Sequence, residues 1–367
     1  MYMNVNEIQK MDNCGCFPTP LHRLENVSSE LGCNVYIKRD DLTGLGFSGN
    51  KIRKLQYLVH DAKARGCNTL LTFGGTQTNH GRQTAAVACR YGMKSIILAT
   101  SEDGRVPERL SGNLLLDAIL DCDVRFLDTS DLHGADKNLN VDEIKAETTR
   151  RRQIAAEKIV AEYERNGDKV YVMPAGGSTV LGAMGYFFAT QEILKQLDDM
   201  GQHIDYLICS SGSNGTYAGL WLGSRYFNAP YEVIGAAVSP RSEQYAINMA
   251  KYINDISAEY DLGITAAPED LHLLCTEYAG TAYDVPDEAT FRTVYRLARS
   301  EGIFVDPCYT GKGFSALYGL IEKGEIPKGS SVLFVHTGGT PGLFSQQHLD
   351  AFSRELWEGR THEIIKI

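Results

Sequence analysis

Short apolar runs alternate with longer amphipathic stretches along most of this 367-residue chain. Runs of four to six apolar or β-branched residues are typical of buried strands. Such runs occupy residues 69–73, 95–99, 124–127, 170–173, 206–209, 233–237 and 331–336. Because helical stretches separate them, the pattern predicts an α/β protein with a doubly wound, largely parallel sheet.

Two of the longer stretches have the 3.6-residue periodicity of amphipathic helices. The stretch 51–64 places five apolar side chains on one face: Ile52, Leu55, Leu58, Val59 and Ala62. Gly66 follows it and suits a helix C-cap. The stretch 287–300 places its inward positions at Phe291, Val294, Tyr295, Leu297 and Ala298. Both stretches are predicted to be helices with a buried apolar face.

The segment 128–167 departs from this pattern, because it is polar and highly charged until Ile154. It predicts a solvated helix with opposite charges at neighbouring turns. A basic docking surface is the alternative, although Glu143, Glu147 and Glu157 dilute the arginines at 150–152. We expect a large domain from residues 1–50 and 169–367, and a small domain from residues 51–168 that contains this polar insert.

Composition narrows the class of protein. The chain is 43% hydrophobic and 22% charged, as in ordinary globular enzymes. A net charge of -10 argues against a nucleic-acid-binding surface, which needs clustered positive charge. The sequence contains neither an apolar run long enough to cross a bilayer nor a signal-peptide pattern. These features predict a cytoplasmic enzyme without a membrane or nucleic-acid partner.

The nine cysteines are scattered along the chain, and several lie in apolar segments. This distribution favours reduced, buried thiols over a disulfide framework. Cys14 and Cys16 resemble half a metal site, but no second Cys or His pair with ligand spacing follows. We therefore expect no metal.

Five polar or glycine-rich junctions follow predicted strands or open predicted helices: residues 47–51, 74–82, 174–179, 210–216 and 336–340. Ligands of open α/β sheets bind at such junctions, because backbone N–H groups and helix dipoles point there. Residues 74–82 predict an anion nest for a carboxylate, to which Thr78 and Asn79 add donors. Residues 210–216 predict a cradle for one phosphate monoester, since they match neither a P-loop nor the dinucleotide fingerprint.

Lys51 stands at the start of the predicted helix 51–64, where the helix dipole disfavours a cation. A lysine that reaches into a pocket and forms a Schiff base explains this position, since burial lowers the pKa of an amine. A solvated lysine is the alternative, and Lys54 competes with Lys51 one turn further on. One phosphate cradle, one carboxylate nest and one pocket lysine together predict pyridoxal 5'-phosphate (PLP) and an amino-acid substrate.

At this point the sequence resembles the 1-aminocyclopropane-1-carboxylate (ACC) deaminase / D-cysteine desulfhydrase family. The resemblance rests on Ser-Gly-Asn-Lys-Ile-Arg-Lys-Leu at 48–55, Gly-Thr-Gln-Thr-Asn-His-Gly-Arg-Gln-Thr-Ala-Ala at 75–86, Gly-Gly-Ser at 176–178, Asp-Pro-Cys-Tyr-Thr-Gly-Lys at 306–312 and His-Thr-Gly-Gly at 336–339. It extends from Pro18 to Phe344 with the motifs in the family's order. It implies fold type II of the PLP enzymes (tryptophan synthase β-like), with two doubly wound open twisted sheets, and a homodimer.

The resemblance also implies roles for individual residues. Lys51 corresponds to the lysine that carries the cofactor, Asn79 to the asparagine beside its 3′-oxygen, and Thr337 to the position facing its pyridine nitrogen. The phosphate loop corresponds to Gly212, Ser213, Asn214, Gly215 and Thr216. The implied substrate pocket consists of Thr78, Asn79, His80, Tyr278, Tyr309 and Thr310, and the implied catalytic residues are Lys51, Thr78, Tyr278 and Tyr309.

Two positions favour the desulfhydrase branch of that family. The ring-opening deaminases resemble Asp-Pro-Val-Tyr-Glu and His-Leu-Gly-Gly, whereas this chain has Tyr309-Thr310 and His336-Thr337. A carboxylate beside the pyridine nitrogen would strengthen the electron sink that opening of a cyclopropane demands. A neutral threonine gives a weaker sink, which is sufficient when the β-substituent is a good leaving group.

These features together predict a PLP-dependent α,β-eliminating lyase that converts D-cysteine to pyruvate, sulfide and ammonia. Two departures from the family leave L-cysteate sulfo-lyase activity open: the segment 128–167 is long, and Thr78 stands where serine is usual. ACC deaminase activity is a further alternative. A ligand-binding protein that lost catalysis is disfavoured by the intact Lys51, Asn79 and Tyr309.

Overall fold

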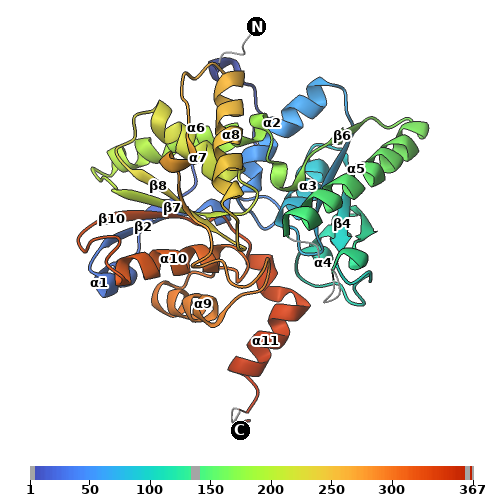
Figure 1. The fold of residues 1–367 in the computed structure, drawn as a ribbon. Helices are drawn as coiled ribbons and strands as arrows, with labels where there is room; N and C mark the ends of the chain where they lie inside the picture. Colours follow the sequence, from blue (N-terminus) through green and yellow to red (C-terminus); the bar gives the residue numbers. More distant parts are fainter. Residues whose placement is uncertain (1–4, 134–140, 360–363, 366–367) are drawn as a thin grey trace.

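Two twisted sheets form the centre of the fold (Figure 1). The computed structural model describes residues 5–133, 141–359 and 364–365. The first sheet has the strand order β1 (Leu21–Arg23), β2 (Asn34–Lys38), β10 (Ser331–Val335), β7 (Tyr206–Ser211), β8 (Glu232–Ala237) and β9 (His272–Leu274). The second has the order β5 (Asp123–Asp128), β4 (Lys94–Ser101), β3 (Thr69–Gly75) and β6 (Val170–Val172). All pairs are parallel except β1 with β2.

Helices cover both faces of each sheet. One face of the six-stranded sheet packs against α6 (Val180–Asp199), α7 (Gly215–Tyr226) and α8 (Gln244–Glu259), and the other against α1 (Glu25–Leu31), α9 (Glu288–Glu301) and α10 (Thr310–Glu322). The four-stranded sheet lies between α5 (Val141–Arg165) on one face and α2 (Lys51–Ala64) with α3 (Asn79–Arg90) on the other. Within β3, Leu70 joins the α2–α3 core and Leu71 the α5 core, as the two-residue period of a strand requires. The remaining helices are α4 (Gly112–Ile119) and α11 (Gln346–Leu356).

The seven predicted strands and both predicted helices are present, which confirms the α/β, doubly wound class. The prediction omitted β1, β2 and β9. In β2, a buried lysine obscures the apolar run: Lys38 is 1% exposed, and its Nζ donates to the Thr19 carbonyl at 2.7 Å and to Glu192 at 2.5 Å. Its charge is therefore compensated inside the protein, which composition alone does not reveal.

The predicted domain boundary at residue 168 does not follow the sheets. β6 belongs by sequence to the predicted large domain, but its residues 170–172 pair with residues 69–71 of β3 in the smaller sheet. The backbone N–H and C=O groups along one edge of β3 need hydrogen-bond partners, and β6 supplies them. The division of the chain into two domains otherwise stays a prediction.

The polar segment is only partly a solvated helix. Residues 134–140 lie outside the described residues, and α5 follows them. On its outer face Glu147 forms ion pairs with Arg150 and Arg151, which confirms opposite charges at neighbouring turns. On its inner face Ala156 and Ile159 are buried against the smaller sheet. The insert is thus part of the core as well as of the surface.

All nine cysteines are free thiols. Four of them are buried as predicted, whereas Cys16 and Cys89 are exposed. Burial raises the pKa of the Cys14 thiol to about 11 and that of Cys209 to about 12. Within the described parts of the chain, no helix is long and apolar enough to span a membrane.

Helices α2 and α6 cross with almost no space between them, because Gly185 lies at their contact. A Cβ at Gly185 would lie 2.3 Å from the carbonyl oxygen of Arg53. We expect Gly185→Ala to lower the free energy of unfolding by roughly 1–3 kcal/mol, since backbone has to shift to admit the methyl group. Urea unfolding of this variant beside Gly342→Ala, whose Cβ would meet nothing closer than 4.0 Å, checks this. Equal stability of the two variants would contradict the tight crossing.

Candidate active site

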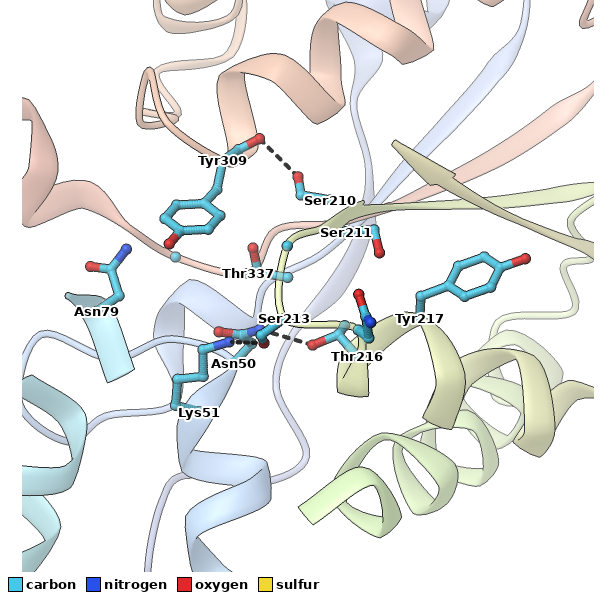
Figure 2. A pocket seen from close by; sticks show the side chains of 13 residues that line it. Asn50, Lys51, Asn79, Ser210, Ser211, Ser213, Thr216, Tyr217, Tyr309 and Thr337 are labelled. Atoms are coloured by element: carbon cyan, nitrogen blue, oxygen red, sulfur yellow. Dashed lines mark hydrogen bonds between the residues drawn. The ribbon is translucent and has the colours of Figure 1, made fainter. Parts of the chain in front are cut away.

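Lys51 is the first residue of α2, and its side chain extends into a cavity between the two sheets (Figure 2). Its backbone N–H donates to Gln83 at 3.1 Å, and the preceding Asn50 N–H donates to the Thr337 carbonyl at 3.0 Å. The Lys51 Nζ lies 3.5 Å from the Ser213 hydroxyl. Burial lowers the pKa of Lys51 to about 8, so far more of its amine is unprotonated and nucleophilic near neutral pH than in an ordinary lysine.

Lys54, the competing lysine, points away from this cavity. It is fully buried, and its Nζ donates to the Gly176 carbonyl at 3.1 Å and to the Ser178 hydroxyl at 3.3 Å. Burial and the nearby Lys51 hold its pKa well below the usual range. It lines neither of the two cavities around Lys51. Geometry therefore favours Lys51 as the reactive lysine.

The loop 212–216 forms the wall opposite Lys51 and leads into the N-terminus of α7. The N-cap residue Asn214 makes no side-chain cap bond, and the Gly215 N–H donates to the Ser213 carbonyl at 2.9 Å and to the Ser178 hydroxyl at 3.3 Å. The following N–H groups of the first turn are therefore the ones suited to an anion. Asn214 adopts φ 71°, and its Oδ1 is buried without a hydrogen-bond partner. At Gly215 a Cβ would lie 2.7 Å from the Lys54 Nζ, so a side chain there would displace the buried Lys54. Lys54 thus packs directly behind a site suited to a phosphate group.

A second helix N-terminus faces the same cavity. Thr78 caps α3 by accepting a hydrogen bond from the Gly81 N–H at 3.1 Å. His80 lines the cavity, and neither of its ring nitrogens has a partner among the described residues. Burial and the neighbouring lysines hold the pKa of His80 well below its usual value, so the ring is neutral. The carboxylate site predicted for residues 74–82 stays a prediction, and the helix N-terminus that it needs lies at the cavity.

Two neighbouring side chains fix the orientation of the Asn79 amide by hydrogen bonds. Its Oδ1 accepts hydrogen bonds from the Asn113 Nδ2 at 3.0 Å and from the Arg82 Nη2 at 3.5 Å. The Asn79 NH₂ group is therefore the one left to donate into the cavity (Figure 2).

We expect Asn113→Ala to weaken binding of PLP about 3- to 10-fold, because one hydrogen bond that orients Asn79 contributes about 0.5–1.5 kcal/mol. Titration of the cofactor-free protein with PLP measures this constant. Asn166→Ala, at the exposed turn residue that follows α5, serves as the control. Unchanged affinity in Asn113→Ala would mean that Asn79 needs no such support.

Two tyrosines meet at the cavity, but only one is among those predicted. Tyr309 lines both cavities, and its hydroxyl makes a hydrogen bond to that of Tyr283. Tyr278 does not fit the predicted role: it packs beside α10 with the Lys323 Nζ 5.1 Å from its ring centre, and it lines neither cavity. Residues 275–287 form a loop whose path depends on tertiary packing, so the spacing of its tyrosines did not reveal which one turns inward.

Thr310 also differs from its predicted role in substrate binding. Its side chain is fully buried and lines neither cavity, because its hydroxyl donates to Asp306 at 2.6 Å. Asp306 also accepts from the Tyr309 N–H at 2.8 Å. Thr310 therefore stabilises the turn that presents Tyr309. Thr337, in contrast, lines the cavity beside Lys51 as predicted.

The larger of the two cavities has a volume of about 440 Å³ and opens beyond Lys51. Its walls come from the carboxyl ends of β3 and β4, from the loop 212–214, from the region after β8 and from α5. Arg152 and Arg241 also line it, although the sequence did not single them out as site residues. Across the described chain, no group of three or more His, Cys, Asp or Glu could hold a metal ion.

Fold and site together define the class of PLP-dependent enzymes: a lysine with a lowered pKa faces a glycine-rich helix N-terminus between two doubly wound sheets. A family model described as pyridoxal-phosphate dependent enzyme matches residues 15–338, and the chain belongs to this family. The cofactor predicted from the sequence is thereby confirmed.

Individual relatives narrow the class. The chain is 37% identical over 326 residues to a "Putative 1-aminocyclopropane-1-carboxylate deaminase" of Pyrococcus abyssi, covering 89% of this chain and 90% of the relative. It is 36% identical over 330 residues to a "D-cysteine desulfhydrase" of Salmonella typhi, covering 89% and 93%. The crystal structure of an ACC deaminase homologue superposes with a TM-score of 0.80 at 32% identity, covering 97% of this chain and all of that one.

These matches confirm the predicted resemblance to the ACC deaminase / D-cysteine desulfhydrase group and the fold of its members. The protein is a PLP-dependent lyase of the elimination and deamination type. The names of its relatives divide between two substrates.

Proposed function

We propose that the protein catalyses α,β-elimination from a β-substituted amino acid, with D-cysteine as the first candidate and pyruvate, sulfide and ammonia as products. The observation that carries this proposal is the neutral Thr337 beside Lys51, in the same cavity as Tyr309. A neutral partner for the cofactor ring suits a substrate with a good leaving group better than a cyclopropane.

The residues around Lys51 fit PLP. Lys51 would bond to its aldehyde carbon, and Thr337 would face its ring nitrogen. Asn79 would donate to its 3′-oxygen. The backbone N–H groups of the loop 212–216 would bind its phosphate, with the unpartnered Asn214 Oδ1 at the same wall. When bound, PLP draws electron density away from the α-carbon of an attached amino acid, which makes the α-proton acidic.

Side chains of the protein and one helix N-terminus would carry out the remaining steps. The N-terminus of α3, with Thr78 and His80, would hold the substrate carboxylate. Lys51 would accept the α-proton at its Nζ, since its lowered pKa leaves an unprotonated amine. The bond between the β-carbon and its substituent then breaks, and the substituent leaves with the electron pair.

Tyr309 would supply the proton for the leaving group. Burial holds the pKa of Tyr309 well above its usual value, so the hydroxyl keeps its proton at neutral pH. Tyr283, whose hydroxyl bonds to that of Tyr309, connects it to the cavity mouth. Water then converts the released unsaturated amino acid to pyruvate and ammonia.

L-Cysteate is the second candidate, with sulfite as leaving group. Thr78 adds a methyl group at the carboxylate site, and the arginines of the larger cavity favour an anionic substituent. ACC is disfavoured by Thr337. A homodimer and a cytoplasmic location stay predictions.

A product assay on PLP-loaded protein tests the proposal, with D-cysteine, L-cysteine, L-cysteate and ACC offered separately. Pyruvate with sulfide from D-cysteine is the expected result. Pyruvate with sulfite from L-cysteate would support the proposed elimination but make L-cysteate, not D-cysteine, the substrate. 2-Oxobutanoate from ACC, without turnover of the sulfur compounds, would contradict the proposal.

A further inference from the structure

The insert helix α5 forms one wall of the larger cavity. Five of its residues line the cavity: Ile144, Lys145, Thr148, Thr149 and Arg152. Their spacing of one, three or four residues places them on one face of a helix. The polar insert therefore faces the space that the substrate would enter.

Arg152 differs from the two arginines before it. Arg150 and Arg151 form ion pairs with Glu147, and Arg151 also pairs with Asp131. Arg152 instead donates to the Thr100 hydroxyl at 2.5 Å and to the Gly74 carbonyl at 3.4 Å. Among the described residues no carboxylate forms an ion pair with Arg152. Burial lowers its pKa, and the weaker opposing effects of Tyr283 and Glu102 do not offset this.

A second guanidinium faces the cavity from the other sheet. The Arg241 Nη2 donates to the Gly212 carbonyl at 2.9 Å, and its plane lies over the ring of Tyr245 at 4.9 Å. Its Nε is buried without a hydrogen-bond partner. The two sheets thus each bring one arginine, held by uncharged groups, to the same space.

The charges of this cavity exceed what the cofactor and a simple amino acid require. Its lining includes Lys51, Arg152 and Arg241, against one carboxylate, Glu102. The cofactor phosphate has the loop 212–216 and the N-terminus of α7, and the substrate carboxylate has the N-terminus of α3. A half-buried arginine without an anionic partner is costly, so its presence at a ligand cavity indicates an anion that arrives with the ligand.

We propose that Arg152 binds an anionic group on the β-carbon of the substrate, so that the enzyme acts on amino acids with a β-sulfonate or β-thiolate rather than an uncharged β-substituent. This inference rests on the proposed function and names the substrate class of the same site. The planar guanidinium matches the oxygens of a sulfonate, to which it can donate two parallel hydrogen bonds. Arg241 adds positive potential from the opposite wall.

The position of Arg152 also suits the bond that breaks. The residue lies near Tyr283, which bonds to Tyr309, the proposed proton donor to the leaving group. As the carbon–sulfur bond breaks, its electron pair moves onto sulfur and the negative charge there grows. A fixed cation beside that sulfur stabilises the transition state more than the bound substrate.

Steady-state kinetics of wild type, Arg152→Gln, Arg152→Lys and Arg150→Gln test the proposal, with L-cysteate, D-cysteine and both enantiomers of β-chloroalanine. β-Chloroalanine undergoes the same elimination with an uncharged substituent. We expect R152Q to lower kcat/KM about 30- to 100-fold for L-cysteate or D-cysteine, as loss of a charged hydrogen bond predicts, and less than about 3-fold for β-chloroalanine. R152K is expected to lose less than R152Q. R150Q, on the outer face of the same helix, should match wild type.

If R152Q lowered kcat/KM equally for all substrates, the proposal would be overturned. Arg152 would then bind the amino-acid part that all the substrates share, or support the fold. Unchanged kinetics with the sulfur substrates would overturn it as well. Binding of ethanesulfonate, which has no amine, is measured in parallel by ligand NMR on wild type and R152Q. Binding to wild type alone supports the anion site even if no substrate is turned over, in which case only the proposed function fails. No binding to wild type and no selective kinetic loss would reject the anion site.

Discussion

Lys51→Ala is expected to lose the visible absorbance of lysine-bound PLP and to lower kcat by about 10³-fold or more, because it removes both the covalent attachment and the proposed base. Spectra and rates of PLP-saturated protein measure both effects. Lys51, whose half-buried amine has a pKa of about 8, lines the cavity, whereas the Lys54 Nζ donates to the Gly176 carbonyl.

Lys63→Ala provides the control, since Lys63 lies on the exposed part of the same helix. It should keep the absorbance and the rate. Retention of the absorbance in Lys51→Ala would contradict the assignment and point to Lys54.

Arg53→Met is expected to lower the free energy of unfolding by about 3–5 kcal/mol, because it leaves the buried Asp40 without its ion-pair partner and Glu192 with Lys38 alone. Arg53 is buried, and its guanidinium donates to Asp40 at 2.7 Å and to Glu192 at 2.8 Å. These pairs fix α2, and with it Lys51, against α6 and the 3-10 turn Asp40–Leu42.

The same pairs predict a pH dependence. The adjacent Arg53 holds the pKa of Asp40 at about 2, below its ordinary value, despite the opposing effect of burial. A depressed carboxyl pKa stabilises the fold above the ordinary pKa, and this stabilisation is lost as the pH falls toward 2. Wild type should therefore lose stability on acidification more steeply than Arg53→Met.

Urea unfolding at neutral and acidic pH measures both effects. Arg65→Met removes an exposed ion pair with Asp61 near the end of the same helix and should cost less than about 1 kcal/mol. Similar losses for the two variants would show that the buried network contributes little.

The strands and α2 could be predicted because their signals are local. A run such as Leu70-Leu71 needs no knowledge of its partners, and the α2 periodicity follows from the helix itself. The short strands β1 and β9 lack such a run, and in β2 the charge of Lys38 is compensated by residues about 150 positions away. Only the folded chain brings these partners together.

In the candidate site, too, the residues marked by a local sequence signal could be predicted and the others could not. Glycines and hydroxyls at strand ends mark the loop 212–216 and the segment 78–80, and the structure brings both to the cavity at Lys51, where their binding roles stay predictions. Tyr278 and Thr310 line neither cavity, because sequence proximity to a motif does not fix the direction of a side chain. Arg152 was read as part of a solvated charged helix, since nothing local distinguishes it from Arg150.

Reductive trapping tests the central claim most directly. Borohydride reduction of PLP-loaded protein fixes the cofactor to its lysine, and trypsin cleavage after Arg53 separates Lys51 from Lys54 for mass spectrometry. The account predicts that the cofactor is found on the peptide that contains Lys51. Cofactor on Lys54, or on no lysine at all, would contradict it.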